Sequence, residues 1–129
     1  MAVMGQIRGG AGGGEKVKVG TFSVSVNQTK EVNEIGFEPK KLVVYKVSAG
    51  SGSYLANYST EIVFDKDIST TKQYRTYVNT STGGGGGDVL NIDGTSYNRI
   101  TEINSSGFKY AVGSESGWAG TYSYIAWSD

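Results

Sequence analysis

The chain has 129 residues, with 12 basic and 12 acidic side chains and neither cysteine nor histidine. Without cysteine it forms no disulfide, zinc–thiolate site or thiol nucleophile, and without histidine it lacks the commonest general base and transition-metal ligand. The balanced, scattered charge argues against nucleic-acid or anionic-membrane binding, because both need a positive field. No apolar run reaches the length of a membrane span, so no membrane-spanning segment is predicted.

The composition favours an all-β protein. Nine tyrosines, two tryptophans and 20 glycines accompany a single proline, and no stretch shows a convincing apolar repeat at helical spacing. We therefore expect one domain over residues 16–129, an antiparallel β-sandwich with a jelly-roll or related topology. A flexible glycine-rich leader over residues 1–15 is expected to precede it.

The leader has too little apolar surface to offset the entropy of ordering a glycine chain. Val3, Met4, Ile7 and Arg8 nevertheless precede its glycines. Two interpretations stay open: a disordered tail, and a segment that docks into a larger assembly.

Two strands are expected at the start of the domain. Over residues 16–27 the apolar side chains change parity between Val19 and Phe22. A β-bulge at Gly20 would bring both sets to the core face, so we expect one there. Residues 30–35 are predicted to form a second, shorter strand.

Residues 36–47 are predicted to be the central strand. The run around Val43 is the densest β-branched and aromatic stretch of the chain, so we expect it to be buried on both faces, or nearly so. Pro39 fixes φ and Gly36 permits an unusual turn, which together indicate a rigid corner at the entry. A hairpin loop over residues 48–53 should follow.

The middle of the chain alternates strands and turns. Residues 54–64 are expected to form one or two strands, interrupted near residues 59–60, and residues 65–67 a turn. A further strand should occupy residues 72–78. Residues 83–87 are five consecutive glycines, and we expect a loop there because ordering glycine costs the most entropy.

The last third is also β-patterned. A short apolar run at residues 89–92 precedes a strong turn signal at residues 93–94. Alternating strands are predicted at residues 97–103 and 121–127, with another turn at residues 105–107. Short strands separated by regular turn signals are typical of an antiparallel sandwich or barrel.

Six segments resemble a small β-sandwich domain found at the C-terminal end of bacteriophage tail-fibre, baseplate and minor structural proteins. They are residues 20–24, 36–40, 42–45, 97–100, 105–109 and 122–127. Their order is more specific than any one of them. A weaker likeness, carried by residues 36–44 and the terminal aromatic strand, is to the H-type lectin sandwich, which is trimeric and binds sugars.

The resemblance implies a virion component, on the head or the tail. It also implies a homotrimer, a host cell-surface glycan as a possible ligand, and contact with other virion proteins through the leader. It assigns no ligand residue.

No complete catalytic or metal-binding motif is present. Residues 83–87 lack the Lys-Ser/Thr pair and the helix of a phosphate-binding loop. Asp65 and Asp67 could give two oxygens to calcium, but a full site needs about six to eight, so a solvated turn is favoured. Carboxylates that could form a glycosidase pair are Glu61, Asp65, Asp88, Asp93 and Glu102. We expect no metal and no cofactor.

The aromatic side chains are more informative, because they exceed what one small core needs. Exposed tyrosine and tryptophan stack on sugar rings or fill subunit interfaces. Trp118, in a polar, glycine-flanked segment, is the leading candidate for a recognition residue; the alternative is a lid over the edge of the sandwich. Tyr77 and Arg75 share a strand face and could form a stacking and hydrogen-bonding pair, or an ordinary exposed face.

These observations predict a non-enzymatic bacteriophage virion protein that attaches to a host surface or glycan. The alternative is a capsid or tail decoration protein without a ligand. A polysaccharide-degrading enzyme is the third hypothesis.

Overall fold

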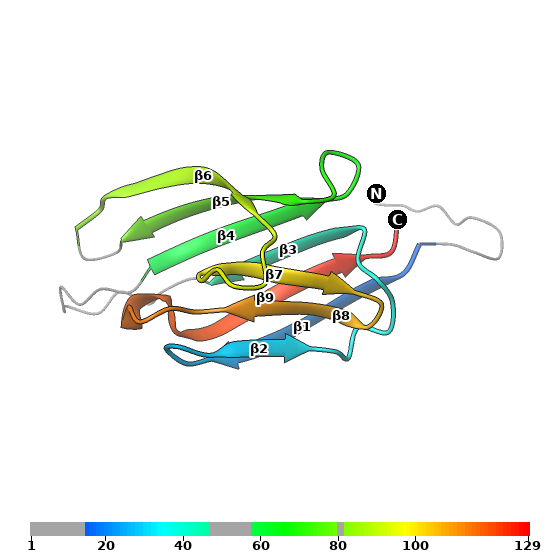
Figure 1. Ribbon diagram of the computed structural model, residues 1–129, viewed down its shortest axis with the longest axis horizontal. Coiled ribbons are helices and arrows are strands. Elements are labelled where there is room, and N and C mark those ends of the chain that lie inside the picture. The colour runs from blue at the N-terminus through cyan, green and yellow to red at the C-terminus, as the bar shows by residue number, and fades with distance from the viewer. Residues whose placement is uncertain (1–14, 47–57, 80–81) are drawn as a thin grey trace.

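The computed structural model describes residues 15–46, 58–79 and 82–129. It confirms an all-β sandwich of two antiparallel sheets, a wide sheet with strand order β1-β9-β3-β4-β5-β6 and a small sheet with order β2-β8-β7. Figure 1 shows the small sheet in front of the wide one. The predicted docking residues of the leader, Val3, Met4, Ile7 and Arg8, lie outside the described residues, as does the predicted loop at residues 48–53.

The strands are short and joined mostly by tight turns. The wide sheet consists of β1 (Val17–Val24), β9 (Gly120–Trp127), β3 (Lys41–Lys46), β4 (Tyr58–Asp65), β5 (Lys72–Asn79) and β6 (Gly85–Asn91). The small sheet consists of β2 (Thr29–Val32), β8 (Gly107–Ala111) and β7 (Arg99–Asn104), and one 3-10 turn, η1 (Ser116–Trp118), precedes β9.

The core is the layer of side chains between the two sheets. Strand alternation sends every second residue of the wide sheet inward, and aromatic rings from both sheets meet there. Phe22 of β1 stacks on Tyr122 of β9 with ring centroids 5.4 Å apart. Phe108 of β8 meets Tyr124 of β9 edge to face at 5.5 Å. The contact between Phe108 and Tyr124 joins the small sheet to the wide one.

One buried glutamine also joins the sheets. Gln73 of β5 is fully buried, and its amide nitrogen donates to the carbonyl of Ile100 in β7 at 2.7 Å and to that of Asn91 at 3.1 Å. Its amide oxygen accepts from the backbone N–H of Ile100 at 2.8 Å. The side chain therefore satisfies both backbone groups of one residue in the facing sheet.

The central strand β3 is buried on one face. Leu42 and Val44 are fully buried, whereas Val43 and Tyr45 are only half-buried. The prediction of burial on both faces is wrong, because the small sheet covers the inner face alone. The corner before β3 is confirmed: Gly36 has φ +86°, and Pro39 is buried.

The expected bulge at Gly20 is absent. β1 pairs with β9 in continuous register from Val17 to Val24, so Val17 and Val19 stay on the outer face, where Val19 is 64% exposed. The glycine has a different role. A Cβ at Gly20 would lie 2.5 Å from the hydroxyl oxygen of Tyr124, whose ring covers the position. The change in parity of the apolar residues at Gly20 therefore marks the place where the ring of Tyr124, on the neighbouring strand, lies over the glycine.

Gly20→Ala is expected to lower the free energy of unfolding by about 1–3 kcal/mol, because Tyr124 is fully buried and its ring cannot swing aside. Glycine-to-alanine changes in strands normally stabilise when space allows. Urea denaturation checks the sign, with Thr21→Ala on the exposed side of β1 as the control. A gain in stability would show that the ring relocates.

The glycine run is partly strand, which corrects the predicted loop. Gly85, Gly86 and Gly87 pair with Val78, Tyr77 and Thr76 of β5. Composition alone suggested a loop, but β5 supplies a template whose hydrogen bonds offset the entropy of ordering glycine. Close approach also excludes larger residues, since a Cβ at Gly85 would lie 2.4 Å from the carbonyl oxygen of Tyr77.

Two other boundaries differ from expectation. β4 runs without a break from Tyr58 to Asp65, so the interruption near residues 59–60 does not occur. β7 begins at Arg99 rather than residue 97, because Asn98 has φ +61° and closes the preceding turn. The turns predicted at residues 65–67, 93–94 and 105–107 are present within one residue of these bounds, at residues 66–68, 94–95 and 105–106.

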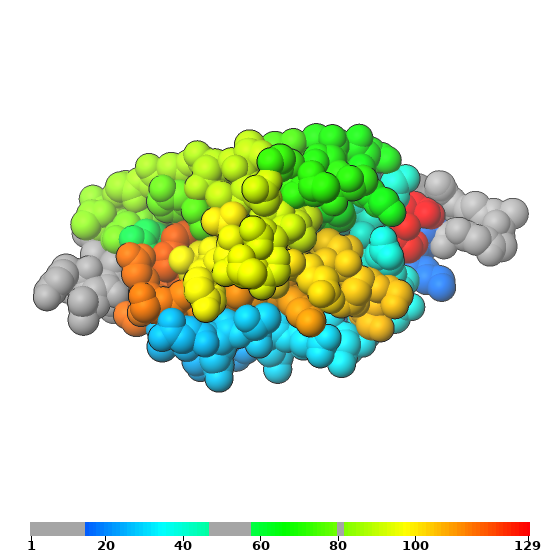
Figure 2. Space-filling view, in the orientation of Figure 1, coloured from blue at the N-terminus to red at the C-terminus, as the bar shows by residue number. Residues whose placement is uncertain are grey.

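The small sheet leaves part of the wide sheet uncovered. Figure 2 shows β7 and β8 in the centre with β2 below them, whereas β4, β5 and β6 extend beyond the small sheet at the top. The opposite, outer face of the wide sheet is turned away in this view. That face carries no strand in the described parts of the chain.

Candidate functional site

The three residues predicted to bind a ligand, Arg75, Tyr77 and Trp118, meet on the inner face of the wide sheet. The Arg75 guanidinium carbon lies 5.1 Å from the Trp118 ring and 5.4 Å from the Tyr77 ring. Tyr77 and Trp118 meet edge to face at 5.7 Å. The alternation of β5 predicted that Arg75 and Tyr77 share a face, but only the fold brings Trp118 to them.

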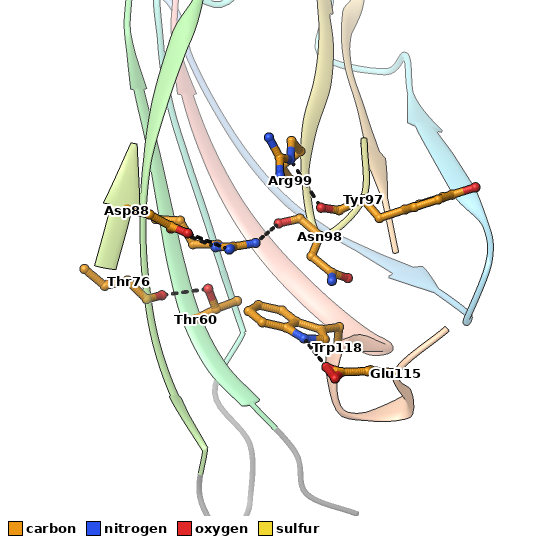
Figure 3. Close-up of polar contacts among 9 residues, drawn as sticks. Thr60, Thr76, Asp88, Tyr97, Asn98, Arg99, Glu115 and Trp118 are labelled. Carbon is orange, nitrogen blue, oxygen red and sulfur yellow. Dashed lines mark hydrogen bonds and ion pairs between the residues drawn. The ribbon is translucent and has the colours of Figure 1, made fainter. Parts of the chain in front are cut away.

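Arg75 also bridges the two sheets. Its guanidinium binds Asp88 of β6 through two hydrogen bonds, at 3.1 and 2.8 Å. A third bond, at 2.8 Å, goes to the backbone carbonyl of Asn98. Figure 3 shows Asp88 and Asn98 on opposite sides of the space between the sheets. A bidentate arginine with this many partners is held in place, which suits a structural role.

Trp118 is enclosed rather than displayed. It lies in η1, is 5% exposed, and stacks on Tyr58 with ring centroids 4.5 Å apart. Its indole N–H donates to the Glu115 carboxylate at 3.2 Å (Figure 3). This placement supports the lid interpretation. Ligand binding by these residues stays a prediction, and it would require η1 to move.

A buried lysine lies under the same turn. Lys46 of β3 is 7% exposed, and its ammonium donates to the carbonyls of Tyr58 at 3.0 Å and Gly117 at 2.9 Å. Burial lowers its pKa by removing water from the charged form. Lys46 therefore ties β3 to β4 and η1.

Two buried tyrosines connect η1 to the small sheet. The Tyr122 hydroxyl donates to the Trp118 carbonyl at 2.6 Å, and the Tyr110 hydroxyl donates to that of Tyr122 at 3.4 Å. Burial raises the pKa of Tyr122 to about 12 and the pKa of Tyr110 well above its usual value. Both side chains stay neutral across the physiological range.

This burial predicts a loss of stability in alkali. An acid whose pKa is raised on folding stabilises the fold fully below its unfolded pKa of about 10, and the contribution disappears as pH rises through the folded value. We expect the wild-type chain to lose roughly 2–3 kcal/mol between pH 10 and 12 from Tyr122. Tyr122→Phe should be less stable near pH 7, with a difference from wild type that narrows in alkali. Urea denaturation at several pH values measures this; a constant difference would contradict it.

The outer face of the wide sheet carries an apolar row that crosses all six strands. Its members are cross-strand neighbours: Val19, Ile125, Val43, Val63, Tyr74 and Val89. The two end residues, Val19 and Val89, are 64% and 57% exposed, and the four between them are half-buried. We call this set the apolar row.

Polar residues flank the middle of the apolar row on both sides, whereas Val17 of β1 and Trp127 of β9 extend the apolar surface at one corner. One flank lies two residues from the row along each strand and consists of Trp127, Lys41, Asp65 and, on β5, Lys72. Two positions in the other direction lie Ser123, Tyr45, Glu61, Thr76 and Gly87. Charged residues therefore sit at the centre of each flank, beside the middle of the row.

A shallow hollow of about 680 Å³ adjoins the apolar row on this face. The residues that contribute side chains to it by strand alternation are Tyr45, Ser59, Glu61, Thr76 and Val78. Gly85 of β6 and Gly83 of the adjoining turn leave it open on one side. The hollow combines one aromatic ring, hydroxyls and a carboxylate. Sequence reasoning missed it, because it depends on the pairing of four strands.

The other candidate carboxylates have local structural partners. Asp88 pairs with Arg75, and Glu102 lies 3.7 Å from Lys109. Asp93 accepts from the backbone N–H and the hydroxyl of Thr95, which lowers its pKa. Within residues 15–46, 58–79 and 82–129 there is no group of three potential metal ligands.

Asp65 and Asp67, weighed as calcium ligands, form an ordinary turn. Asp65 accepts from the backbone N–H of Asp67 at 3.0 Å. Asp67 pairs with Lys40 at 3.3 Å. The turn is therefore held by groups of the chain itself.

Among the described residues no helix has the length and apolar character needed to cross a membrane. Comparisons with protein-family models, curated proteins and solved structures gave no match.

Proposed function

We propose that the protein is a non-enzymatic component of a bacteriophage virion that acts by surface contact through the outer face of its wide sheet. The bacteriophage setting rests on the resemblance of the six sequence segments. The contact function rests on one observation, the apolar row across all six strands. Decoration or assembly of the particle is the form of this function that the row supports best.

The apolar row supports contact because a solvated sheet face normally carries polar residues at alternate positions. Here one outward position on every strand of the wide sheet is valine, isoleucine or tyrosine, and these positions are cross-strand neighbours. Contiguous apolar patches on soluble proteins mark sites of interaction. Burying this row against a partner would remove its contact with water, which is the main favourable term in protein association.

Carbohydrate attachment is the second candidate, and the hollow favours it. Sugars bind in shallow sites through ring stacking and hydrogen bonds to hydroxyls and carboxylates. Tyr45 and Glu61 are cross-strand partners in the hollow, which places a ring beside a carboxylate. In this form of the proposal a host-surface glycan is the ligand.

Incorporation into particles tests the proposed function. Mass spectrometry of purified particles should detect the chain in a fixed ratio to the major structural proteins. A chain carrying Val43→Lys should be depleted from particles at least tenfold, whereas Ile68→Lys, in the exposed turn after β4, should be retained. A chain abundant in infected cells but absent from particles would contradict the proposal.

Binding to an array of bacterial surface polysaccharides tests the second candidate. Tyr45→Ala and Glu61→Gln should each weaken binding at least tenfold, with Glu102→Gln on the small sheet as the control. An array without signal for the wild-type chain would rule out this use of the hollow. The homotrimer and the contact between the leader and other virion proteins stay predictions that these experiments do not address.

A further inference from the structure

We infer that the apolar row binds the apolar row of a second copy of the chain, in a dimer with its two-fold axis parallel to the strands, between β3 and β4. The inference rests on the proposed function, because it names the partner of the same surface. It follows from the order of residues along the outer face, which is complementary to itself under this rotation.

The rotation reverses the strand order of the second copy, so β3 lies over β4 of the partner and β1 over its β6. Val43 then faces the partner's Val63, and Val19 faces the partner's Val89. Ile125 faces the partner's Tyr74. Every member of the apolar row meets another apolar side chain. Such isologous pairing is the commonest symmetry of homo-oligomers.

The flanking charges match in the same arrangement. Lys41 faces the partner's Asp65, and by symmetry Asp65 faces the partner's Lys41. Tyr45 faces the partner's Glu61, which places a hydroxyl donor against a carboxylate. Trp127 faces the partner's Lys72, which places an ammonium group opposite an indole ring. No like charges are opposed among these positions, and complementary potentials of this kind fix the register of an interface.

The other two-fold arrangement is unfavourable. An axis along the apolar row would also place apolar residues on apolar residues, but it would exchange the two polar flanks. Asp65 would then face the partner's Glu61, twice in each dimer. Opposed like charges disfavour a pairing, so the charges select the axis parallel to the strands.

The face is large enough for a specific dimer. Six strands spaced ~4.8 Å apart span ~24 Å, and an eight-residue strand is ~27 Å long, which gives a face of roughly 650 Å². Stable interfaces bury about 800 Å² per partner, and weaker ones less. Two sheets pack face to face at ~10 Å in β-sandwiches, with interlocking side chains. A moderate-affinity dimer is therefore expected.

The mass of the full chain in solution is the first test. Sedimentation over a range of micromolar concentrations should show a monomer–dimer equilibrium. Val43→Asp should raise the dissociation constant about 100-fold while the circular dichroism spectrum is kept, because Val43 is only half-buried in the monomer. Ile68→Asp, which places the same charge on an exposed aliphatic residue outside the face, should leave the constant unchanged. A monomer at all concentrations would overturn the inference, and so would a trimer, the oligomer that the resemblance implies in place of this dimer.

Thiol cross-linking fixes the axis, since the chain has no cysteine of its own. A mixture of Val19→Cys and Val89→Cys chains should be joined by a short bis-maleimide, because these residues face each other across the dimer. Each variant alone should not be joined, since its two thiols would lie roughly 24 Å apart. Cross-linking of Val19→Cys chains to one another would indicate the other axis and overturn the arrangement.

These results separate the inference from the proposed function. A chain that is monomeric yet retained in particles contradicts the dimer and leaves the virion function standing. A chain that is dimeric yet absent from particles contradicts the virion function and leaves the dimer standing.

Discussion

Gly107→Ala is expected to lower the free energy of unfolding by about 3 kcal/mol or more, because a methyl group has no room there. Gly107 begins β8 with φ +157°. A Cβ at this position would lie 2.0 Å from the carbonyl oxygen of Val32 and 3.0 Å from its carbonyl carbon. Val32 pairs with Phe108 in the β2–β8 ladder, so the methyl group would push β2 away from β8. Both close atoms belong to the backbone, and no rotamer change can relieve the contact.

Thermal unfolding followed by circular dichroism measures this effect, and a fall in Tm of about 10–15 °C corresponds to 3 kcal/mol for a domain of this size. Gly94→Ala is the matched control. It lies in the turn after β6, and a Cβ there would meet no atom within 4 Å. An unchanged Tm for Gly107→Ala would mean that β2 shifts without cost. Loss of soluble protein for Gly107→Ala alone would agree with the prediction.

Gln73→Leu is expected to cost roughly 2–5 kcal/mol, although leucine is close to glutamine in size. The substitution removes three hydrogen bonds and leaves the buried N–H and carbonyl of Ile100 without the amide of Gln73. Each buried backbone group left without a partner costs about 1–3 kcal/mol. An added apolar side chain cannot compensate, since Gln73 is already fully enclosed.

Urea denaturation of Gln73→Leu measures the loss, and Gln28→Leu provides the comparison. Gln28 is exposed and accepts one hydrogen bond from the backbone N–H of Ser25 at 3.1 Å, so its replacement should change stability by less than about 1 kcal/mol. Equal stability of Gln73→Leu and wild type would show that water or a shift of β7 replaces the amide.

Local alternation predicted much of the fold. Tyr122 and Tyr124 of β9 share a parity and both are fully buried, as the sequence pattern indicates for a half-buried strand. The turns at Asp93 and at residues 105–107 follow from local chemistry, because the side chains of Asp93 and Asn104 accept hydrogen bonds from backbone N–H groups two or three residues further on. These features depend on a few neighbouring residues, so the sequence is enough to find them.

Features that depend on strand pairing could not be predicted in this way. Gly20 is not the expected bulge, and Gly85, Gly86 and Gly87 are not in the expected loop, because atoms of the paired strands leave little room for a side chain at these positions. Gln73 looks like an ordinary polar residue until β7 lies over it. Trp118 carries polar and glycine neighbours in sequence, yet Arg75 and Tyr58 enclose it in space.

The apolar row is the clearest example of a feature that depends on strand pairing. Val19 and Ile125 are cross-strand neighbours although more than 100 positions separate them in the chain. Each of the two residues was assigned to a strand, but no local pattern gives the register that places them in one row. The apolar row therefore exists only through the pairing of all six strands.

The position of β9 has a consequence for how the protein is made. β9 is the last of the nine described strands in sequence, yet in the wide sheet it lies between β1 and β3 and pairs with both. During synthesis β1 and β3 emerge early, and the edges that pair with β9 stay unpaired until β9, at residues 120–127, has been translated. Such distant pairing slows folding. A premature stop before Gly120 would remove an interior strand rather than an edge, so truncated products are expected to be targets for proteolysis and not smaller versions of the native protein.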